Sequence, residues 1–455
     1  MLALELNDIE LTLVSDSDVL QRQPGFAYVS ADRVMIGEEA MAQARLTPIL
    51  THSRYWQELG PQPLARPGKQ LASFADLAYA QLAALKTTAG VADAQVLIAV
   101  PAHYDREQLG LLLGIAKEAG FPVAGLIDAA VAASANECAR QRIVHLDIHL
   151  HHAVVTVLEC AQELRRVGHE VHPQLGLLAL QARWIDAIAA EFVRRTRFDP
   201  LHHAQTEQQL WNRLPHWLEA LGREPQCAVS VAFEGDSIGV DISAALLLEA
   251  VAMSYAELSQ LVQRVQLAGA SYSLLLTSRV AALPGLQEQL AKLRNTHIAV
   301  LPFAAAAFGT LAFESVIRRP PENLVLLQRL PVAKAADATS ATQAPEREAS
   351  ALQPTHVLFG ERAFAIGEQP LVAGSAVTEA LRALPVPAAA GVSRSHCTFL
   401  IERGAVRLRD HSTYGTFING QRVEGSFELA VGDRVTLGAP TQPDGGFLLI
   451  RVMRD

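Results

Sequence analysis

The segment DHSTYGTFING, residues 410–420, decides the fold of the C-terminal part of the chain, together with SRSH at residues 393–396. Short segments rich in β-branched and aromatic residues surround both motifs, and turns that contain glycine separate them. They are residues 398–401, 406–409, 416–418, 434–437 and 447–452. Frequent short strands with glycine-containing turns are typical of a β-sandwich. We therefore predict an all-β sandwich for residues 355–455.

This region resembles the forkhead-associated (FHA) family. The resemblance rests on the glycine after an early strand, on residues 393–396 and on residues 410–420, which follow the order and spacing of the family's signature. It implies protein recognition, typically of a phosphothreonine peptide. The phosphopeptide-binding residues that it implies are Ser393, Arg394, Thr413 and Tyr414, and the structural positions are Gly374, His396, Gly415, Asn419 and Gly420.

The resemblance assigns chemistry to these residues. The hydroxyls of Ser393 and Thr413 would donate hydrogen bonds to the phosphate, and Arg394 would add a charge-assisted one. Residues 355–455 contain arginine but no lysine. Arginine suits recognition of carboxylate or phosphate. A biased surface composition would equally explain why arginine occurs here without lysine.

Two residues depart from the FHA pattern. Ser375 stands where the family carries a phosphate-binding arginine, and Tyr414 replaces the asparagine that holds the peptide backbone. A lost charge-assisted contact costs about 1.5–3 kcal/mol, or roughly ten- to a hundredfold in affinity. Arg382 is a candidate to reach the site instead. Phosphothreonine binding and phosphate-independent docking both remain open at this point.

The first 332 residues alternate between strand and helix patterns. We expect strands at residues 2–14, 96–101, 123–127, 273–276 and 298–301, and a strand pair at 143–158. We expect helices at residues 105–119, 129–140, 175–197 and 242–267, the first beginning after Asp105 as N-cap. Interleaved strands and helices predict an α/β domain whose sheets are covered on both faces.

Residues 1–332 resemble the nucleotide-binding domain of DnaK-type heat-shock chaperones, which implies an actin-like ATPase fold. The best match is VLIAVPAHYDREQLGLLLGIAKEAGFPVAGLIDAAVAASA, residues 96–135, and further matches lie at residues 37–48 and 302–313. The chain is thus expected to be multidomain, with domains at 1–332 and 355–455 and a flexible linker at 333–354. The linker is predicted from its Ala, Thr, Ser, Gln and Pro composition.

The phosphate loops of that chaperone family are overwritten here. Glycine and threonine in two hairpins let phosphate approach the backbone, but other side chains occupy these places. The degenerate positions are Glu5, Asn7 and Asp8 in the first hairpin, Asp147 and His149 in the second, and Thr277 and Ser278 at the adenosine-side motif. The resemblance therefore implies a pseudo-ATPase with no cofactor, ATP and Mg²⁺ being disfavoured.

Four side chains of the second hairpin suggest a metal site as an alternative. His145, Asp147, His149 and His151 alternate, so a continuous strand would place them on one face. Zn²⁺ needs tetrahedral convergence rather than a row along a strand. Polar residues at a sheet edge or in an emptied cleft are therefore the favoured interpretation.

Composition and charge limit the partners and the compartment. The formal net charge of −9 argues against nucleic acid and anionic membranes as partners. No run of 18 apolar residues predicts a membrane span, and residues 1–16 lack the basic region of a signal peptide. The four cysteines show no metal-binding spacing and are expected to be buried, reduced residues of a cytoplasmic protein.

These features together predict a non-catalytic adaptor or scaffold. Its FHA domain would recognise a protein partner, by phosphothreonine in the first instance, beside a nucleotide-binding fold without phosphate loops. The alternative is a chaperone-like ATPase that the FHA domain regulates.

Overall fold

The computed structural model describes most of the chain, which divides into two compact units, Met1–Ala335 and Ala336–Asp455. The described residues are 1–16, 18–69, 71–91, 94–138, 141–266, 271–320, 323–332, 354–359, 362–367, 369–375, 382–386, 392–402, 405–412, 415–418, 421–423, 425–429, 431, 433–438 and 447–450. The predicted linker lies outside them, apart from Pro354.

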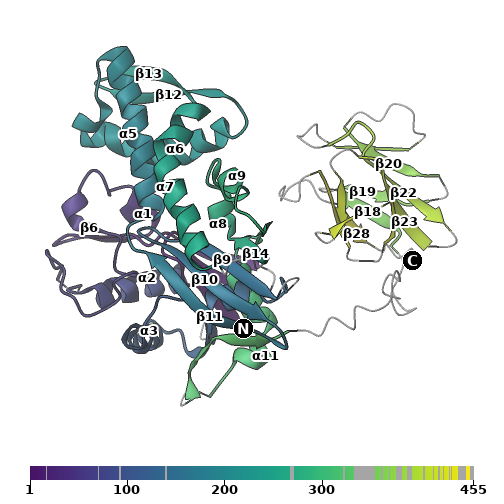
Figure 1. Ribbon diagram of the computed structural model, residues 1–455, viewed down its shortest axis with the longest axis horizontal. Coiled ribbons are helices and arrows are strands. Elements are labelled where there is room, and N and C mark those ends of the chain that lie inside the picture. The colour runs from purple at the N-terminus through teal and green to yellow at the C-terminus, as the bar shows by residue number, and fades with distance from the viewer. Residues whose placement is uncertain are drawn as a thin grey trace. The chain divides into compact units, whose positions relative to one another are not determined.

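Two six-stranded sheets form the centre of the N-terminal unit (Figure 1). The first contains, in spatial order, β16 (Leu326–Leu327), β8 (Val123–Asp128), β7 (Val96–Val100), β1 (Leu2–Glu5), β2 (Leu11–Ser15) and β3 (Asp18–Gln23). The second contains β15 (Thr296–Val300), β14 (Tyr272–Leu276), β9 (Arg142–Ile148), β10 (Ala153–Cys160), β11 (Glu163–His172) and β17 (Arg329–Pro331).

The same topology occurs in both sheets. Strands β1, β2 and β3 form an antiparallel meander, and β7 and β8 extend it in parallel from β1. Strands β9, β10 and β11 form the second meander, which β14 and β15 extend in parallel from β9. The hairpins β1–β2 and β9–β10 therefore hold equivalent positions in the two sheets.

Apolar cores cover both faces of each sheet, as the alternating pattern predicts. Helices α2 (Phe74–Ala89) and α3 (Arg106–Glu118) pack on the first sheet, and α5 (Leu177–Thr196) and α7 (Ala244–Arg264) pack on the second. A further core joins the inner faces of the two sheets around α4 (Ala129–Ala133) and α10 (Ala305–Ala312). A Cβ at Gly309 would lie 2.1 Å from the Ala132 carbonyl oxygen, so glycine permits this close approach of the two short helices.

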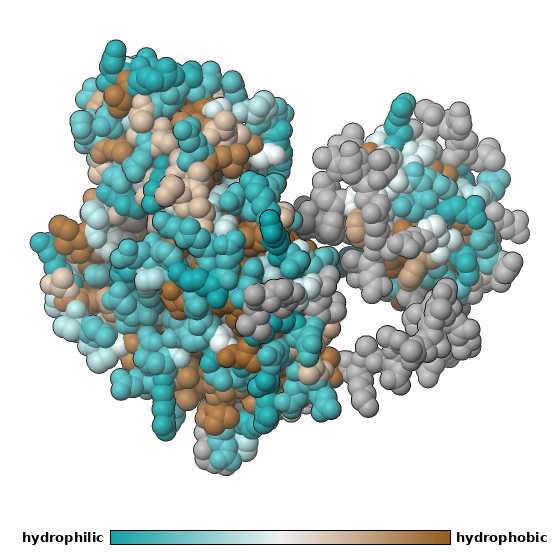
Figure 2. Space-filling view, viewed as in Figure 1, coloured by the Kyte–Doolittle hydropathy of each residue, from teal (hydrophilic) through white to brown (hydrophobic). Residues whose placement is uncertain are grey.

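The remaining described elements of this unit are smaller additions to the two sheets. They are α1 (Glu38–Met41), α6 (Ala204–Leu221), α8 (Ser278–Ala281), α9 (Leu286–Leu290), α11 (Glu314–Ile317), the sheet of β4 (Ala27–Val29), β5 (Val34–Ile36) and β6 (Thr51–His52), and the hairpin β12 (Gln226–Phe233) and β13 (Asp236–Ser243). Helices α5, α6 and α7 gather with β12 and β13 in the upper part of the unit (Figure 1). On the face drawn in Figure 2, hydrophilic residues predominate and apolar residues form small scattered patches.

Local sequence signals account for several elements. All five residues of β7 are buried, which confirms the strand predicted from the continuous apolar run. Asp105 and Gln108 form a capping box at the start of α3, and Gly120 follows the helix with φ +77°. These are the end signals that the sequence predicts for this helix.

Three expectations were wrong. The predicted strand at residues 2–14 is a hairpin, because the chain reverses between β1 and β2. The predicted helix at residues 129–140 ends as α4 at Ala133. Cys138 and Cys160 form a disulfide rather than two reduced thiols, with Cα atoms 5.8 Å apart.

Helix α7 has the length and hydropathy of a membrane span, the only such helix within the described part of the chain. Eight of its residues, among them Leu247, Val251 and Leu258, are buried in the core of the N-terminal unit. Core helices of soluble proteins commonly pass the same test.

The C-terminal unit is an all-β sandwich, as predicted. One sheet contains β19 (Arg362–Ala365), β18 (His356–Phe359), β28 (Phe447–Ile450), β27 (Arg434–Leu437), β24 (Thr416–Ile418) and β25 (Gln421–Arg422). The other contains β21 (Ala383–Pro385), β20 (Leu371–Gly374), β22 (Cys397–Glu402), β23 (Ala405–Asp410) and β26 (Ser426–Glu428). Alternate residues such as Phe399, Leu408 and Phe447 fill the core between the sheets.

Candidate functional site

The buried side chain of His396 ties together three segments of the C-terminal unit. Its Nδ1 accepts the Ser393 backbone N–H at 3.0 Å, so the ring proton is on Nε2, which donates to the Gly415 carbonyl at 3.0 Å. The His396 backbone N–H donates to Ala373, and its carbonyl accepts from His411. Burial lowers the pKa of His396 and outweighs the opposing effects of the Gly415 carbonyl and Asp410. The ring is therefore neutral near pH 7.

The turn after β20 packs directly against the loop that contains Ser393. A Cβ at Gly374 would lie 2.1 Å from the Arg394 carbonyl oxygen. The Ser375 N–H donates to the Ser393 carbonyl at 3.1 Å, and its hydroxyl lies 3.5 Å from the Val392 carbonyl. Gly374 thus allows the two backbones to meet, and Ser375 bonds within the loop.

The segment after β23 is held by its own polar groups. Asp410 Oδ1 accepts the Ser412 N–H at 3.0 Å and the Thr416 hydroxyl at 2.7 Å. The Ser412 hydroxyl accepts the Gly415 N–H at 2.7 Å, and Gly415 has φ +96°. Burial raises the pKa of Asp410, but the hydrogen bonds from Thr416 and Ser412 outweigh it, so the net shift is downward.

Two of the implied phosphopeptide residues are described. Ser393 is half-buried and Arg394 is exposed in the loop that His396 anchors. Thr413 and Tyr414 lie outside the described residues, as do Asn419 and Gly420. Arg382, the candidate substitute for the missing arginine, donates instead to the Ala365 carbonyl at 2.5 Å.

A family model for the FHA domain matches residues 380–438. This range includes two of the three segments that His396 joins, the loop of residues 393–396 and the segment after β23. The turn at the end of β20 lies just before it. The C-terminal unit contains an FHA domain. No curated protein matches the chain. The FHA domain is a protein-interaction module, and phosphothreonine is the group that such domains typically recognise.

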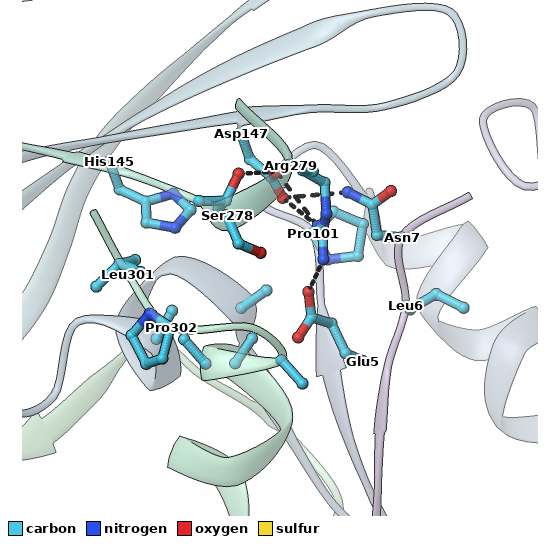
Figure 3. A pocket seen from close by; sticks show the side chains of 16 residues that line it. Glu5, Leu6, Asn7, Pro101, His145, Asp147, Ser278, Arg279, Leu301 and Pro302 are labelled. Atoms are coloured by element: carbon cyan, nitrogen blue, oxygen red, sulfur yellow. Dashed lines mark hydrogen bonds and ion pairs between the residues drawn. The ribbon is translucent and has the colours of Figure 1, made fainter. Parts of the chain in front are cut away.

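In the N-terminal unit, Arg279 of α8 joins the two equivalent hairpins (Figure 3). Its guanidinium forms an ion pair with Glu5 at the end of β1 and another with Asp147 of β9, the latter at 3.1 Å. The Arg279 side chain is 14% exposed. Burial lowers the pKa of Arg279, but the carboxylates of Asp147 and Glu5 outweigh it and raise that pKa overall.

Asp147 is the centre of this network. Its carboxylate also accepts hydrogen bonds from Asn7 Nδ2 at 3.1 Å and from the Thr277 hydroxyl at 2.8 Å. Burial raises the pKa of Asp147, but Arg279 and nearby histidines lower it further, to about 2. A cavity lies beside these residues, and Ser278 also lines it. The centre of a water molecule could occupy only about 20 Å³ of this cavity. The polar groups of the cleft therefore bond mainly to one another.

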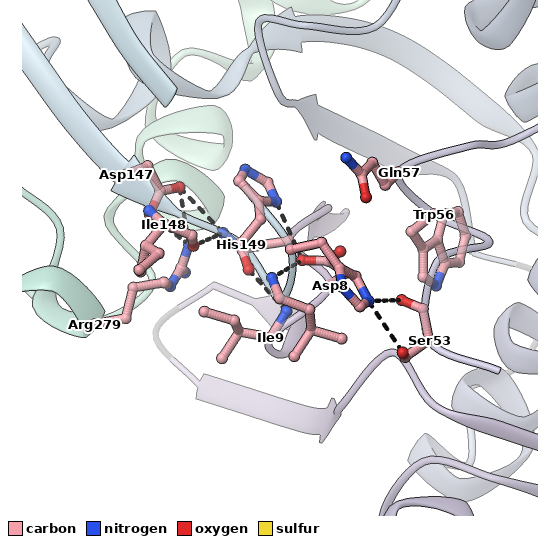
Figure 4. A network of polar contacts seen from close by, with 12 residues as sticks. Asp8, Ile9, Ser53, Trp56, Gln57, Asp147, Ile148, His149 and Arg279 are labelled. Carbon is pink, nitrogen blue, oxygen red and sulfur yellow. Dashed lines mark hydrogen bonds and ion pairs between the residues drawn. The ribbon is translucent and has the colours of Figure 1, made fainter. Parts of the chain in front are cut away.

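Asp8 and His149 form a second polar group between the hairpins (Figure 4). Asp8 Oδ1 accepts the Leu150 N–H at 2.8 Å and lies 3.3 Å from His149 Nδ1. Only His145 and Asp147 of the histidine row lie on one strand, because β9 ends at Ile148 and a tight turn begins there. His151 lies in that turn and its Nε2 is 3.0 Å from the Ser53 hydroxyl.

Five of the seven degenerate positions therefore surround one cavity, which Glu5, Asn7, Asp147, Thr277 and Ser278 line. Sequence reasoning missed Arg279, which follows Thr277 and Ser278 directly. It also missed His103, in the loop after β7, and His152, directly before β10. Arg279 and His103 belong to no motif and have their partners on other segments, whereas His152 stacks on His149 of the same turn.

Proposed function

We propose that this protein is a non-catalytic adaptor whose FHA domain reads a phosphothreonine on a protein partner. The observation that carries the proposal is the loop of residues 393–396. Hydrogen bonds of the buried His396 ring fix its backbone, and the Arg394 side chain is exposed. A loop whose backbone is already held pays a smaller ordering cost at binding, and it carries a hydroxyl and a guanidinium. Both groups bond well to a phosphate dianion.

Ser375 replaces the arginine that the FHA family carries, which removes one charged contact to a phosphate. The loop of residues 393–396 nevertheless keeps its support. Ser375 donates its N–H to the Ser393 carbonyl. In the described part of the domain, Arg394 has no ion-pair partner that would compete with a phosphate. We therefore propose that Arg394 supplies the main charge-assisted contact.

A phosphothreonine peptide library, presented to the full chain beside its unphosphorylated counterpart, tests the proposal. We expect selective capture from the phosphorylated library, and loss of about ten- to a hundredfold in affinity for Ser393→Ala and Arg394→Ala. Arg407→Ala is the matched control, because Arg407 pairs with Glu428 on the face of the sheet. Equal capture from both libraries contradicts phosphate recognition and leaves phosphate-independent docking.

We propose further that the N-terminal unit is an actin-like scaffold that has lost ATP hydrolysis. Its repeated sheet topology supports this, because it gives two equivalent hairpins that face a shared cleft. The Arg279 ion pairs with Glu5 and Asp147 also support it, because carboxylates that pair with an arginine are not free to hold Mg²⁺ in this cleft. Calorimetry with ATP and Mg²⁺ tests it, and micromolar binding with turnover would favour the alternative, an ATPase regulated by the FHA domain.

A further inference from the structure

Three histidines from two segments of the N-terminal unit meet beside the cleft. His103 lies between β7 and α3, and His149 and His152 close the β9–β10 turn. One ring nitrogen of each lies within 4.8 Å of the corresponding nitrogens of the other two. The centroid of the His152 ring lies 4.3 Å from the His103 centroid and 4.3 Å from the His149 centroid.

Buried polar atoms in this cluster have no partner within the described residues. Both ring nitrogens of His103 and both of His152 are buried without a hydrogen bond, as is Asp8 Oδ2. A buried polar atom without a partner costs about 1–3 kcal/mol, and five of them at one place are unusual for a folded protein. A packing role alone would favour apolar side chains here, so the cluster points to a ligand.

Asp8 orients one of the three imidazoles. Its Oδ1 lies 3.3 Å from His149 Nδ1, and it is fixed in turn by the Leu150 N–H at 2.8 Å. A carboxylate beside one nitrogen keeps the proton there and directs the lone pair of the other nitrogen away from it. His149 Nε2 is then the nitrogen available to a ligand.

The spacing suits a small transition-metal ion. Tetrahedral zinc with Zn–N bonds of about 2.0–2.1 Å separates its ligand nitrogens by about 3.3 Å. The three nitrogens need to close by about 1.5 Å at most from their 4.8 Å limit. Because the His149 and His152 rings stack almost parallel, with 8° between their planes, binding requires the His152 ring to turn about its Cβ–Cγ bond while Asp8 holds His149. The adjoining cavity, lined by Asp8 and Gln57 among others, offers about 10 Å³ to the centre of a water molecule. That is room for about one water, the usual fourth ligand of a three-histidine site.

We propose that His103, His149 and His152 bind one Zn²⁺ ion, with Asp8 as the residue that positions His149. Imidazole is a preferred ligand of zinc, whereas Mg²⁺ and Ca²⁺ take oxygen ligands.

The ion would join the two halves of the N-terminal unit. His103 follows a strand of the first sheet, and the other two ligands belong to the hairpin of the second sheet. Asp8 lies in the hairpin of the first sheet. Zinc therefore links the two sheets at a place distinct from the Arg279 network, and it stabilises the unit when bound.

The test measures zinc binding by the purified full chain. Metals are first removed with a chelator, and Zn²⁺ is then added. We expect one equivalent of Zn²⁺ per chain by elemental analysis after dialysis, and a higher unfolding temperature with zinc than without. Co²⁺ in place of zinc should give the strong visible absorption of a four-coordinate ion. Elemental analysis that finds no stoichiometric zinc overturns the proposal, whether or not any variant folds.

Variants locate the site. His103→Gln and His152→Gln should abolish stoichiometric binding, and Asp8→Asn should weaken it by about 10–100-fold. His216→Gln, at an exposed position of α6, is the matched control and should bind as the wild type does. Unchanged zinc and cobalt binding in the His103 and His152 variants would assign the metal to other residues and contradict the proposal.

Discussion

The FHA loops and the cleft of the N-terminal unit use similar polar residues in opposite ways. In the FHA domain a neutral histidine binds backbone groups, and the Arg394 side chain is exposed. In the cleft a buried arginine binds two carboxylates, and the adjoining cavity is small. Polar groups that hold the backbone leave side chains available to a partner, whereas polar groups that satisfy one another do not. Substitutions in each region test this contrast.

The largest effect is expected for Arg279→Gln. It leaves Glu5 and Asp147 as buried carboxylates without their cation, and breaking a buried ion pair costs about 3–5 kcal/mol. All four tryptophans, Trp56, Trp184, Trp211 and Trp217, lie in the N-terminal unit. Denaturation followed by tryptophan fluorescence therefore measures this loss.

Arg223→Gln is the control, because Arg223, just after α6, pairs with Glu219 of α6 and both side chains are exposed. It should change the free energy of unfolding by about 0–1 kcal/mol. Equal effects of the two variants would show that the cleft is not held together by its charges.

Gly374→Ala should have the next largest effect, in the other unit. The new methyl group would lie 2.1 Å from the Arg394 carbonyl oxygen, so the loop that carries Ser393 must move. Overpacking of this kind costs about 1–3 kcal/mol. Hydrogen exchange of the β20 and β22 amides should become faster while the tryptophan transition stays unchanged.

Gly367→Ala separates this effect from a general cost of replacing glycine. Its Cβ would meet only the end of the Arg382 side chain, at 3.3 Å. An equal acceleration of exchange in both variants would remove the special role of Gly374.

A smaller effect is expected from pH. The pKa of His396 is lower in the folded domain than in the unfolded chain, where it is about 6.5. Below pH 6.5 the unfolded chain therefore binds more protons, and stability falls as the pH falls, by up to about 1.4 kcal/mol per pH unit for this one group. Calorimetry of the FHA transition between pH 7.5 and 5.5 measures it, and His396→Gln should reduce the slope. An unchanged slope would assign the pH dependence to other groups.

Much of the fold follows from local sequence signals. The buried run of β7, the capping box of α3 and the short strands of the sandwich are all marked by residues close in sequence. The end of α4 at Ala133 has no such local mark, and the Cys138–Cys160 disulfide joins residues 22 positions apart. The alternating pattern also did not show that His149 and His151 lie beyond the end of β9, since period-two spacing says nothing about where a strand ends.

The candidate sites show the same limit. The FHA motif identified Ser393, Arg394 and His396, because the family concentrates them in one short segment, residues 393–396. Arg279 and His103 acquire their chemistry only when α8 and the loop after β7 meet the two hairpins. Their sequence neighbours give no indication of those partners.

Calorimetric titration of the full chain with a phosphothreonine peptide and with its unphosphorylated form measures phosphate recognition itself. We expect the phosphorylated peptide to bind at least about tenfold more tightly, and Arg394→Ala to remove most of that difference. Equal affinity for the two peptides, or an undiminished preference in Arg394→Ala, would contradict it.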